Sequence, residues 1–261
     1  MSGVGSLLKF FRRMSANIAA GRDHAGPDGQ RVYAVGDIHG HLGLLDDLLA
    51  RIEDDILERP VATIGIVFLG DLIDRGPDSA GVVERLSTLR HFPAKALFLM
   101  GNHEEVLLRV LNGEPNLAYD WLGYGGDACA ESYGVSAPAL HAMSEERIAE
   151  ALRAAIPPAH IAFLESFGDT FRFGDYLFVH AGIRPGVPIE QQQPQDLRWI
   201  RHPFLSDGHD HGCMVVHGHT ISDGVERRAN RIGIDTGAYR SGVLTAAVIE
   251  GSELRFLATG N

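Results

Sequence analysis

Residues 31–76 read RVYAVGDIHGHLGLLDDLLARIEDDILERPVATIGIVFLGDLIDRG, and three patterns follow one another in this stretch. Val32–Val35 is a short apolar run ended by glycine, which is typical of a buried strand. From residue 42 to 56, leucines and isoleucines recur every three or four positions, which predicts an amphipathic helix that ends before Pro60. Residues 61–69 repeat the strand pattern. The order strand, helix, strand indicates a sheet with helical crossovers.

Further along the chain, the alternation of strands and helices continues and then stops. A helix pattern at 79–91 is followed by a strand pattern at 95–100 and by a further helix pattern from about 103. Residues 112–168 hold helical patterns at 117–133 and 144–155, with Gly-Gly and Pro-Pro pairs between them, which predicts a mostly helical insertion. The rest is rich in strand patterns, at 171–179, 213–217, 231–235, 243–249 and 254–258.

These patterns predict one α/β (α+β) domain behind an N-terminal tail. Residues 1–30 interleave apolar and basic side chains and end in a turn cluster, so we expect a flexible tail there. Residues 31–261 are expected to form a single domain with two sheet-forming halves around the insertion at 112–168.

Composition narrows the class of protein. The chain has 261 residues, a formal net charge of −11, 13 His and 2 Cys. Such an acidic chain lacks the positive surface that nucleic acids require, so no nucleic-acid partner is expected. No apolar run approaches the roughly 20 residues that span a bilayer, so no stable membrane insertion is expected. Two cysteines are too few for a disulfide framework, which favours a cytoplasmic protein.

Metal-ligating residue types stand directly after six of the apolar strand patterns. The six clusters are Gly36–Gly40, Gly70–Gly76, Gly101–Glu104, His180–Gly182, His217–Thr220 and Asp235–Ala238. Ligands collect at the carboxyl ends of strands in open sheets. Each cluster alone is explained by a turn or a core histidine, but six in order predict a metal site. Histidine nitrogens with Asp and Asn oxygens, and no thiolate, suit two divalent ions such as Mn²⁺, Fe²⁺ or Zn²⁺.

The spacing within the clusters suggests how two ions are shared. If strand geometry persists after residue 35, Asp37 and His39 lie on one side of the chain and bind one ion. The carboxylate of Asp71 has two oxygens and can bridge both ions. The candidates for completing the second ion are Asn102, His180 and His219.

The motifs GDIHG, GDLIDRG, GNHE, HAG and HGHT resemble those of the phosphoprotein phosphatase (PPP) family of calcineurin-like metallophosphoesterases. The resemblance spans residues 31–250, and the GHT ending and the DTGA segment look most like the bacterial and phage branch of serine/threonine protein phosphatases. It implies two mixed sheets packed as a central β-sandwich flanked by helices. It also implies two divalent ions per chain, with Mn²⁺ expected and Fe or Zn as alternatives. We expect a monomer.

The resemblance assigns a role to individual positions. The implied metal ligands are Asp37, His39, Asp71, Asn102, His180 and His219. His103, oriented by Asp74, is the implied general acid. The implied phosphate-binding residues are Arg75, Asn102 and a second arginine, for which Arg201 is favoured over Arg184. Tyr239 is expected to border the site. His217 departs from the simpler members of the family and is not counted as a ligand.

The chemistry of these residue types predicts hydrolysis of a phosphomonoester without a phosphoenzyme. Two cations about 3.5–4 Å apart can hold a bridging hydroxide and neutralise the ester. An arginine fork binds two phosphoryl oxygens. A positioned acid that protonates the leaving oxygen contributes typically 10²–10⁴-fold.

The predicted function is therefore that of a serine/threonine protein phosphatase acting on phosphorylated proteins or peptides. One alternative is a bis(5'-nucleosyl)-tetraphosphatase or related nucleotide pyrophosphohydrolase. Another alternative is a non-catalytic member that binds a metal or a partner. The insertion at 112–168 and the loop at 182–212 are expected to distinguish the two hydrolases, because both segments can wall the site.

Overall fold

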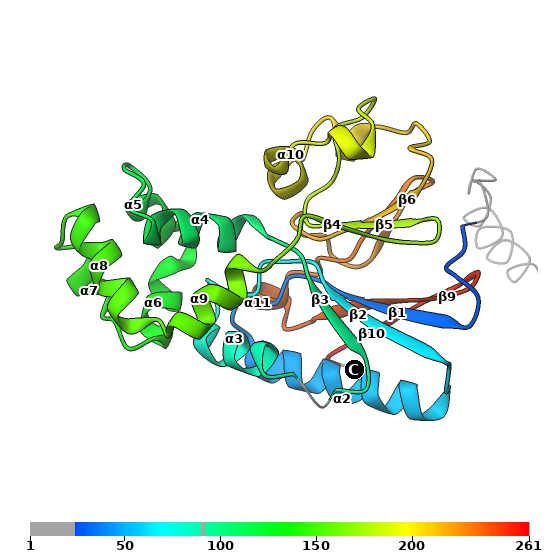
Figure 1. Ribbon diagram of the computed structural model, residues 1–261, viewed down its shortest axis with the longest axis horizontal. Helices are drawn as coiled ribbons and strands as arrows, with labels where there is room; N and C mark the ends of the chain where they lie inside the picture. Colours follow the sequence, from blue (N-terminus) through cyan, green and yellow to red (C-terminus); the bar gives the residue numbers. More distant parts are fainter. Residues whose placement is uncertain (1–23, 90–91, 261) are drawn as a thin grey trace, which may run out of the picture.

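The computed structural model describes residues 24–89 and 92–260 (Figure 1). Of the tail predicted at residues 1–30, residues 1–23 lie outside the described residues. The first half of the chain consists, in order, of β1 (Gln30–Val35), α2 (Leu42–Glu58), β2 (Thr63–Phe68), α3 (Ser79–Ser87), β3 (Lys95–Phe98) and α4 (Asn102–Leu111). Five α-helices and a π-helix follow: α5 (Ala118–Trp121), η1 (Leu122–Gly126), α6 (Asp127–Ser132), α7 (Ala137–Leu140), α8 (Glu145–Ala155) and α9 (Pro158–Glu165).

In the second half, strands outnumber helices. This half holds β4 (Thr170–Phe173), β5 (Tyr176–Val179), α10 (Pro194–Trp199), β6 (Met214–His217), β7 (Glu226–Arg227), β8 (Arg231–Gly233), α11 (Ala238–Ser241), β9 (Thr245–Glu250) and β10 (Glu253–Ala258). None of the helices in the described ranges is both long enough and apolar enough to cross a bilayer.

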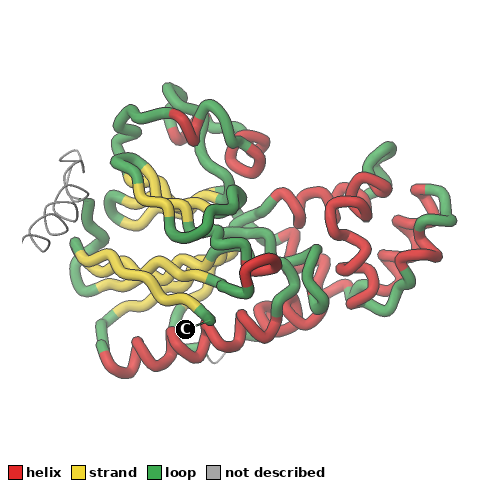
Figure 2. Tube along the Cα trace, turned by 180° about the vertical axis from the view of Figure 1, so that it is seen from behind, coloured by secondary structure: helices red, strands yellow, loops and turns green. Residues whose placement is uncertain are grey.

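Two mixed five-stranded sheets form the centre of the molecule (Figures 1 and 2). The first has the order β10-β9-β1-β2-β3, with β1, β2 and β3 parallel and β9 antiparallel to β1. The second has the order β4-β5-β6-β8-β7, with β5, β6 and β8 parallel. Helices α2 and α3 lie along the outer side of the first sheet, and α10 lies beyond the second. The predicted α/β class, with two mixed sheets between helices, is confirmed.

Side-chain alternation along β1 explains how the first sheet is buried on both faces. Val32 and Ala34 pack into the cluster between the sheets, whereas Tyr33 and Val35 join the cluster under the helices. Successive side chains of a strand point to opposite faces, so one continuous apolar run serves both layers. The amphipathic face of α2 covers the outer layer with Leu45, Leu48, Leu49 and Ile52.

The helical pattern at 117–133 is not one helix. It divides into α5, the π-helix η1 and α6, and Gly125 in η1 has a φ of 111°. Its carbonyl accepts the N–H of Arg75 at 3.0 Å. The interruption therefore connects the helical segment to the loop after β2, and π-helical turns often occur at such functional places.

One expectation for the second half was wrong, and one strand was missed. Residues 171–179 are not one strand, because a two-residue turn at Gly174–Asp175 folds them into the antiparallel hairpin β4–β5. Gly174 has a φ of 59°, which glycine adopts readily. The short strand β7 was not predicted, since two residues carry no readable periodicity.

A buried ionic cluster fastens α2 to the first sheet. Asp55 accepts hydrogen bonds from Tyr33 Oη at 2.5 Å and from both terminal nitrogens of Arg255 at 2.5 and 2.6 Å. Arg31, 1% exposed, lies 3.3 Å from the same carboxylate and also pairs with Glu250. Although burial opposes its charge, the hydrogen bonds from Arg255 and Tyr33 hold the pKa of Asp55 below its usual value.

We predict that Asp55→Asn lowers the free energy of unfolding by about 3 kcal/mol at neutral pH, because the buried Arg31 loses one of its two counter-charges. The contribution of Asp55 is complete above its unfolded pKa and disappears as the pH falls through the lower folded pKa. Urea unfolding of the wild type and the variant at pH 7 and near pH 3 measures the loss of stability and its decrease at low pH. Asp47→Asn, in the exposed pair with Arg51, is the control and should change stability by less than about 0.5 kcal/mol. Equal effects of the two substitutions would contradict the prediction.

Candidate active site

A cavity of about 550 Å³ opens beside the segments that follow β2, β3, β6 and β8. It is lined by Asp71, Arg75, Asn102, His103, Tyr124, Trp199, Arg201, His219, Thr220, Ile221 and Tyr239. The loops that follow the strands of both sheets and the helical segment at 118–126 all contribute to this wall. Chain segments that are far apart in the sequence thus meet at one place.

Asp71 lies between two groups of possible metal ligands. Its Oδ2 is 3.7 Å from His39 Nε2, and its Oδ1 is 3.4 Å from His180 Nε2. Within the described residues, ligand atoms lie within 4.8 Å of one another in two groups of three, His39–Asp71–His103 and Asp71–His180–His219. Asp71 belongs to both groups, so its two oxygens can face two ions.

The imidazoles around Asp71 are already oriented by hydrogen bonds on their other nitrogen. His39 Nδ1 is 2.9 Å from the carbonyl of Ile73, and His180 Nδ1 is 2.8 Å from that of Leu69. Donation to a carbonyl keeps the Nδ1 proton in place and leaves Nε2 unprotonated for a metal. Burial lowers the pKa of His39 to about 3, so its ring is neutral at physiological pH.

The donor set fits divalent cations. Burial and the neighbouring charges of Asp235 and Asp71 raise the pKa of Asp37 well above its usual value. Burial likewise raises the pKa of Asp235 to about 6. Asn102 Oδ1 lies 3.1 Å from His180 Nε2 and 2.8 Å from His219 Nδ1. Crowded carboxylates beside converging imidazole nitrogens are what a cation would neutralise.

The backbone at the site departs from the predicted strand geometry. Strand β1 ends at Val35, and His39 has a φ of 47°, so Asp37 and His39 lie in a turn rather than on one side of a strand. Left-handed backbone recurs at Asp71, Asp74, Arg75 and His219. Each such non-glycine residue costs of order 1–3 kcal/mol and persists only where its surroundings enforce it.

Glu104 is the side chain that enforces the turn after β2. Its buried carboxylate accepts the backbone N–H groups of Asp71 at 2.9 Å, Leu72 at 2.7 Å, Ile73 at 3.3 Å and Gly101 at 3.1 Å. Burial raises its pKa to about 7, while these backbone donors favour the ionised form. Glu104 stands within the GNHE motif, but no role was predicted for it.

His103 and Asp74 are in direct contact. His103 Nδ1 lies 2.7 Å from Asp74 Oδ2, which also accepts the indole N–H of Trp121 at 3.1 Å. Although burial opposes a positive charge on His103, the carboxylates of Asp71 and Asp74 raise its pKa. The Nε2 of His103 faces the cavity, 3.0 Å from Arg75 Nη2.

The two candidate arginines for a second phosphate contact are in different environments. Arg201 lines the cavity with Arg75. Arg184 does not line it; its Nε and Nη2 bond the carboxylate of Asp196 at 2.7 and 2.5 Å. Tyr239 borders the cavity as expected, with its ring 4.8 Å from the guanidinium carbon of Arg75. Two other aromatic side chains of the wall, Tyr124 and Trp199, were not predicted.

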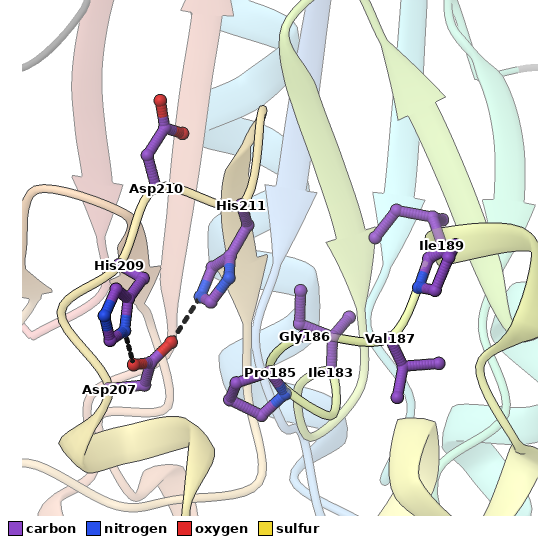
Figure 3. A pocket seen from close by; sticks show the side chains of 10 residues that line it. Ile183, Pro185, Gly186, Val187, Ile189, Asp207, His209, Asp210 and His211 are labelled. Carbon is purple, nitrogen blue, oxygen red and sulfur yellow. Dashed lines mark hydrogen bonds and ion pairs between the residues drawn. The ribbon is translucent and has the colours of Figure 1, made fainter.

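A larger cavity of about 670 Å³ lies elsewhere, between residues 183–189 and 207–211 (Figure 3). Apolar side chains form one wall, and Asp207 lies between two histidines on the other. His209 Nδ1 is 2.5 Å from Asp207 Oδ1, and His211 Nε2 is 3.7 Å from Oδ2. The lining includes neither an arginine nor either of the two ligand groups around Asp71, so we assign the active site to the smaller cavity.

The fold and this site are those of a metal-dependent phosphoesterase, which is a hydrolase. The profile of the calcineurin-like phosphoesterase family matches residues 30–239. The chain therefore belongs to this family, and divalent ions are implied at the residues around Asp71.

Similar proteins carry two kinds of name. The chain is 28% identical to "Serine/threonine-protein phosphatase 2" of Escherichia coli (strain K12), over 83% of this chain and 91% of that protein. It is 30% identical to "Serine/threonine-protein phosphatase 1" of Salmonella typhimurium, over 85% and 93%. It is also 31% identical to a symmetrical bis(5'-nucleosyl)-tetraphosphatase of Methylococcus capsulatus, over 61% of this chain but 45% of that protein.

Solved structures share the fold. One described provisionally as a diadenosine tetraphosphatase superposes with a TM-score of 0.60 at 24% identity, covering 89% of this chain and 95% of the other. A cold-active protein-tyrosine phosphatase of Shewanella superposes with a TM-score of 0.53 at 17% identity, covering 88% and 82%. At these identities the likeness concerns the fold alone.

We predict that Glu104→Gln lowers the free energy of unfolding by roughly 2–4 kcal/mol and reduces turnover by at least tenfold. An amide nitrogen in place of either oxygen would face two backbone donors, and each donor left unpaired costs about 1–3 kcal/mol. Thermal unfolding and initial rates with an aryl phosphate measure the effect. Glu114→Gln, in an exposed pair with Arg109, is the control. Wild-type turnover by the Glu104 variant would show that the turn does not depend on this carboxylate.

Proposed function

We propose that this protein is a serine/threonine protein phosphatase with a dinuclear metal site. The observation that carries the proposal is coverage: the similarity to the two named protein phosphatases extends over more than nine-tenths of their length. The similarity to the Methylococcus tetraphosphatase covers 45% of that protein. A shared core supports shared chemistry, whereas full-length similarity also includes the segments that wall the site.

We assign the metal ligands as Asp37, His39, Asp71, Asn102, His180 and His219, with Asp71 shared. This donor set has imidazole nitrogens and hard oxygens but no thiolate, which suits Mn²⁺ and also Fe or Zn. When bound, the ions supply Lewis-acid stabilisation of the phosphoryl oxygens and lower the pKa of water. Ser222 N–H and Gly237 N–H hold Asp235 beside this set, where its charge adds to the attraction for cations.

Arg75 and Arg201 would bind and orient the phosphoryl group. Arg75 Nη1 and Nη2 now face imidazole nitrogens of His39 and His103, at 3.2 and 3.0 Å. An entering phosphate offers these N–H groups better acceptors, because charge-assisted bonds are the stronger ones. The ring of Tyr239 and the carbonyl of Gly125 limit the movement of Arg75.

His103 would protonate the leaving oxygen from Nε2. Asp74 holds the Nδ1 proton and stabilises the imidazolium, and the indole of Trp121 keeps Asp74 in place. A serine or threonine alkoxide is a poor leaving group, so this proton matters most for the proposed substrates.

A nucleotide substrate is the second candidate. Tyr124, Trp199 and Tyr239 form an aromatic rim around the phosphate-binding residues, and Tyr124 is 61% exposed. Aromatic faces stack on nucleobases as well as on peptide side chains. The rim is therefore compatible with a dinucleoside polyphosphate.

The substrate class is tested by turnover of a phosphoserine peptide and diadenosine tetraphosphate by the same Mn²⁺-loaded preparation. We expect kcat/KM to be at least tenfold higher for the peptide. A preference for the nucleotide would overturn the protein phosphatase assignment while leaving the phosphoesterase class intact.

We predict that His103→Asn reduces the hydrolysis of an alkyl phosphate by 10²–10⁴-fold and that of p-nitrophenyl phosphate far less, because an aryl oxide leaves without a proton. Steady-state kcat for the two esters measures the difference. Equal losses for both would contradict a general-acid role.

We predict that Arg201→Ala lowers kcat/KM for a phosphomonoester by about tenfold to hundredfold, since a charged hydrogen bond contributes roughly 1.5–3 kcal/mol. Arg184→Ala is the matched control, because Arg184 belongs to the same 182–212 loop but is paired with Asp196. A larger loss for Arg184→Ala would reverse the assignment of the second arginine.

A further inference from the structure

His217 is a buried imidazole that the proposed mechanism does not use. It is the last residue of β6, is 1% exposed and pairs with Gly233 of β8. Its ring packs edge-on against Phe204, with 5.2 Å between centroids. A Cβ on Gly233 would come within 3.2 Å of this ring. The imidazole is therefore confined on two sides.

Both ring nitrogens of His217 are engaged. Nε2 lies 3.2 Å from Arg231 Nη1, and Nδ1 lies 3.0 Å from the carbonyl oxygen of Gly218. A guanidinium only donates, so Nε2 accepts and the ring proton is on Nδ1. His217 consequently donates to the Gly218 carbonyl.

Arg231 is itself fixed. It is 2% exposed, and its Nη1 and Nη2 bond the carboxylate of Glu226 in β7 at 2.8 and 3.1 Å. Its Nη2 also donates to the carbonyl of Leu205 at 3.2 Å. A continuous chain of polar contacts thus runs from Glu226 through Arg231 and His217 to Gly218.

The Gly218 carbonyl closes the turn that contains His219. It also accepts the N–H of Thr220 at 2.7 Å, and His219 between them has a φ of 62°. A Cβ on Gly218 would come 2.0 Å from Asp37 Oδ1, so the turn presses against another proposed ligand. Non-glycine residues keep such a conformation only when neighbours enforce it.

Packing does not account for this chain of contacts. An apolar side chain would fill the end of β6, whereas a buried imidazole and guanidinium carry a desolvation cost that their contacts only offset. What the chain achieves is geometric: the N–H of His219 meets Asp37 at 3.0 Å, and the Nδ1 of His219 lies 2.8 Å from Oδ1 of Asn102, another proposed ligand.

We propose that Glu226, Arg231 and His217 are positioning residues that hold the turn of His219 and so present its imidazole to one of the two metal ions. The proposal rests on the proposed metal site and is independent of the substrate. Polar groups that orient a metal ligand typically affect metal affinity by 10–100-fold.

The test compares the metal content of full-length variants. His217→Leu removes both contacts of the imidazole, and Arg231→Met removes the link to Glu226. Arg228→Met is the matched control, because Arg228 bonds the same Glu226 but its side chain is 64% exposed. Each Mn²⁺-loaded protein is equilibrated with graded chelator, and the retained metal is counted by mass spectrometry.

We expect wild type and Arg228→Met to retain two ions alike, and His217→Leu and Arg231→Met to lose one ion at ten- to hundredfold lower chelator concentration. His217→Asn keeps a donor near the Nδ1 position and should restore part of the affinity. The proposal is overturned if Arg231→Met and His217→Asn both retain metal as the wild type does, or if a folded His217→Leu does. It is also overturned if Arg228→Met loses metal as readily as these variants. Absence of bound metal in the wild type would overturn the metal site itself.

Discussion

The carboxylate of Glu104 accepts backbone N–H groups from two separate loops, and the site is organised around these bonds. Three of the donors belong to Asp71, Leu72 and Ile73, and one belongs to Gly101. A carboxylate can accept several hydrogen bonds at once, so one side chain replaces the ladder that β2 and β3 no longer supply. The loop is then free to adopt the left-handed turns that bring Asp71 and Asp74 into the cavity.

The same solution recurs around the site: a buried polar side chain holds an irregular backbone. Asp37 accepts the N–H of His219, and His217 donates to the carbonyl of Gly218. Buried backbone groups must be paired, and side chains do this where strands have ended. These contacts and the packing of the two-sheet core offset the energetic cost of the five left-handed residues at the site.

The helical segment at 118–126 connects the fold to the chemistry. Trp121 donates to Asp74, the carbonyl of Gly125 accepts from Arg75, and Tyr124 lies at the rim. The proposed acid and the proposed phosphate-binding arginine thus share one support. A change in this segment would alter both, which makes it a natural place for relatives with other substrates to differ.

The succession of strands and helices along the chain and the residue types at the strand ends followed from local patterns, because apolar periodicity and ligand-type clusters are readable one segment at a time. Local patterns could not show the break in the helix at 117–133 or the left-handed turn at His39, which depend on contacts with distant residues, whereas the Gly174–Asp175 pair is a local hairpin signal that was missed. They also gave Glu104 no role and left Arg184 and Arg201 as alternatives for the second phosphate-binding arginine. Only the tertiary structure brought Glu104 to the loop after β2 and paired Arg184 with Asp196, since those partners lie in other parts of the chain.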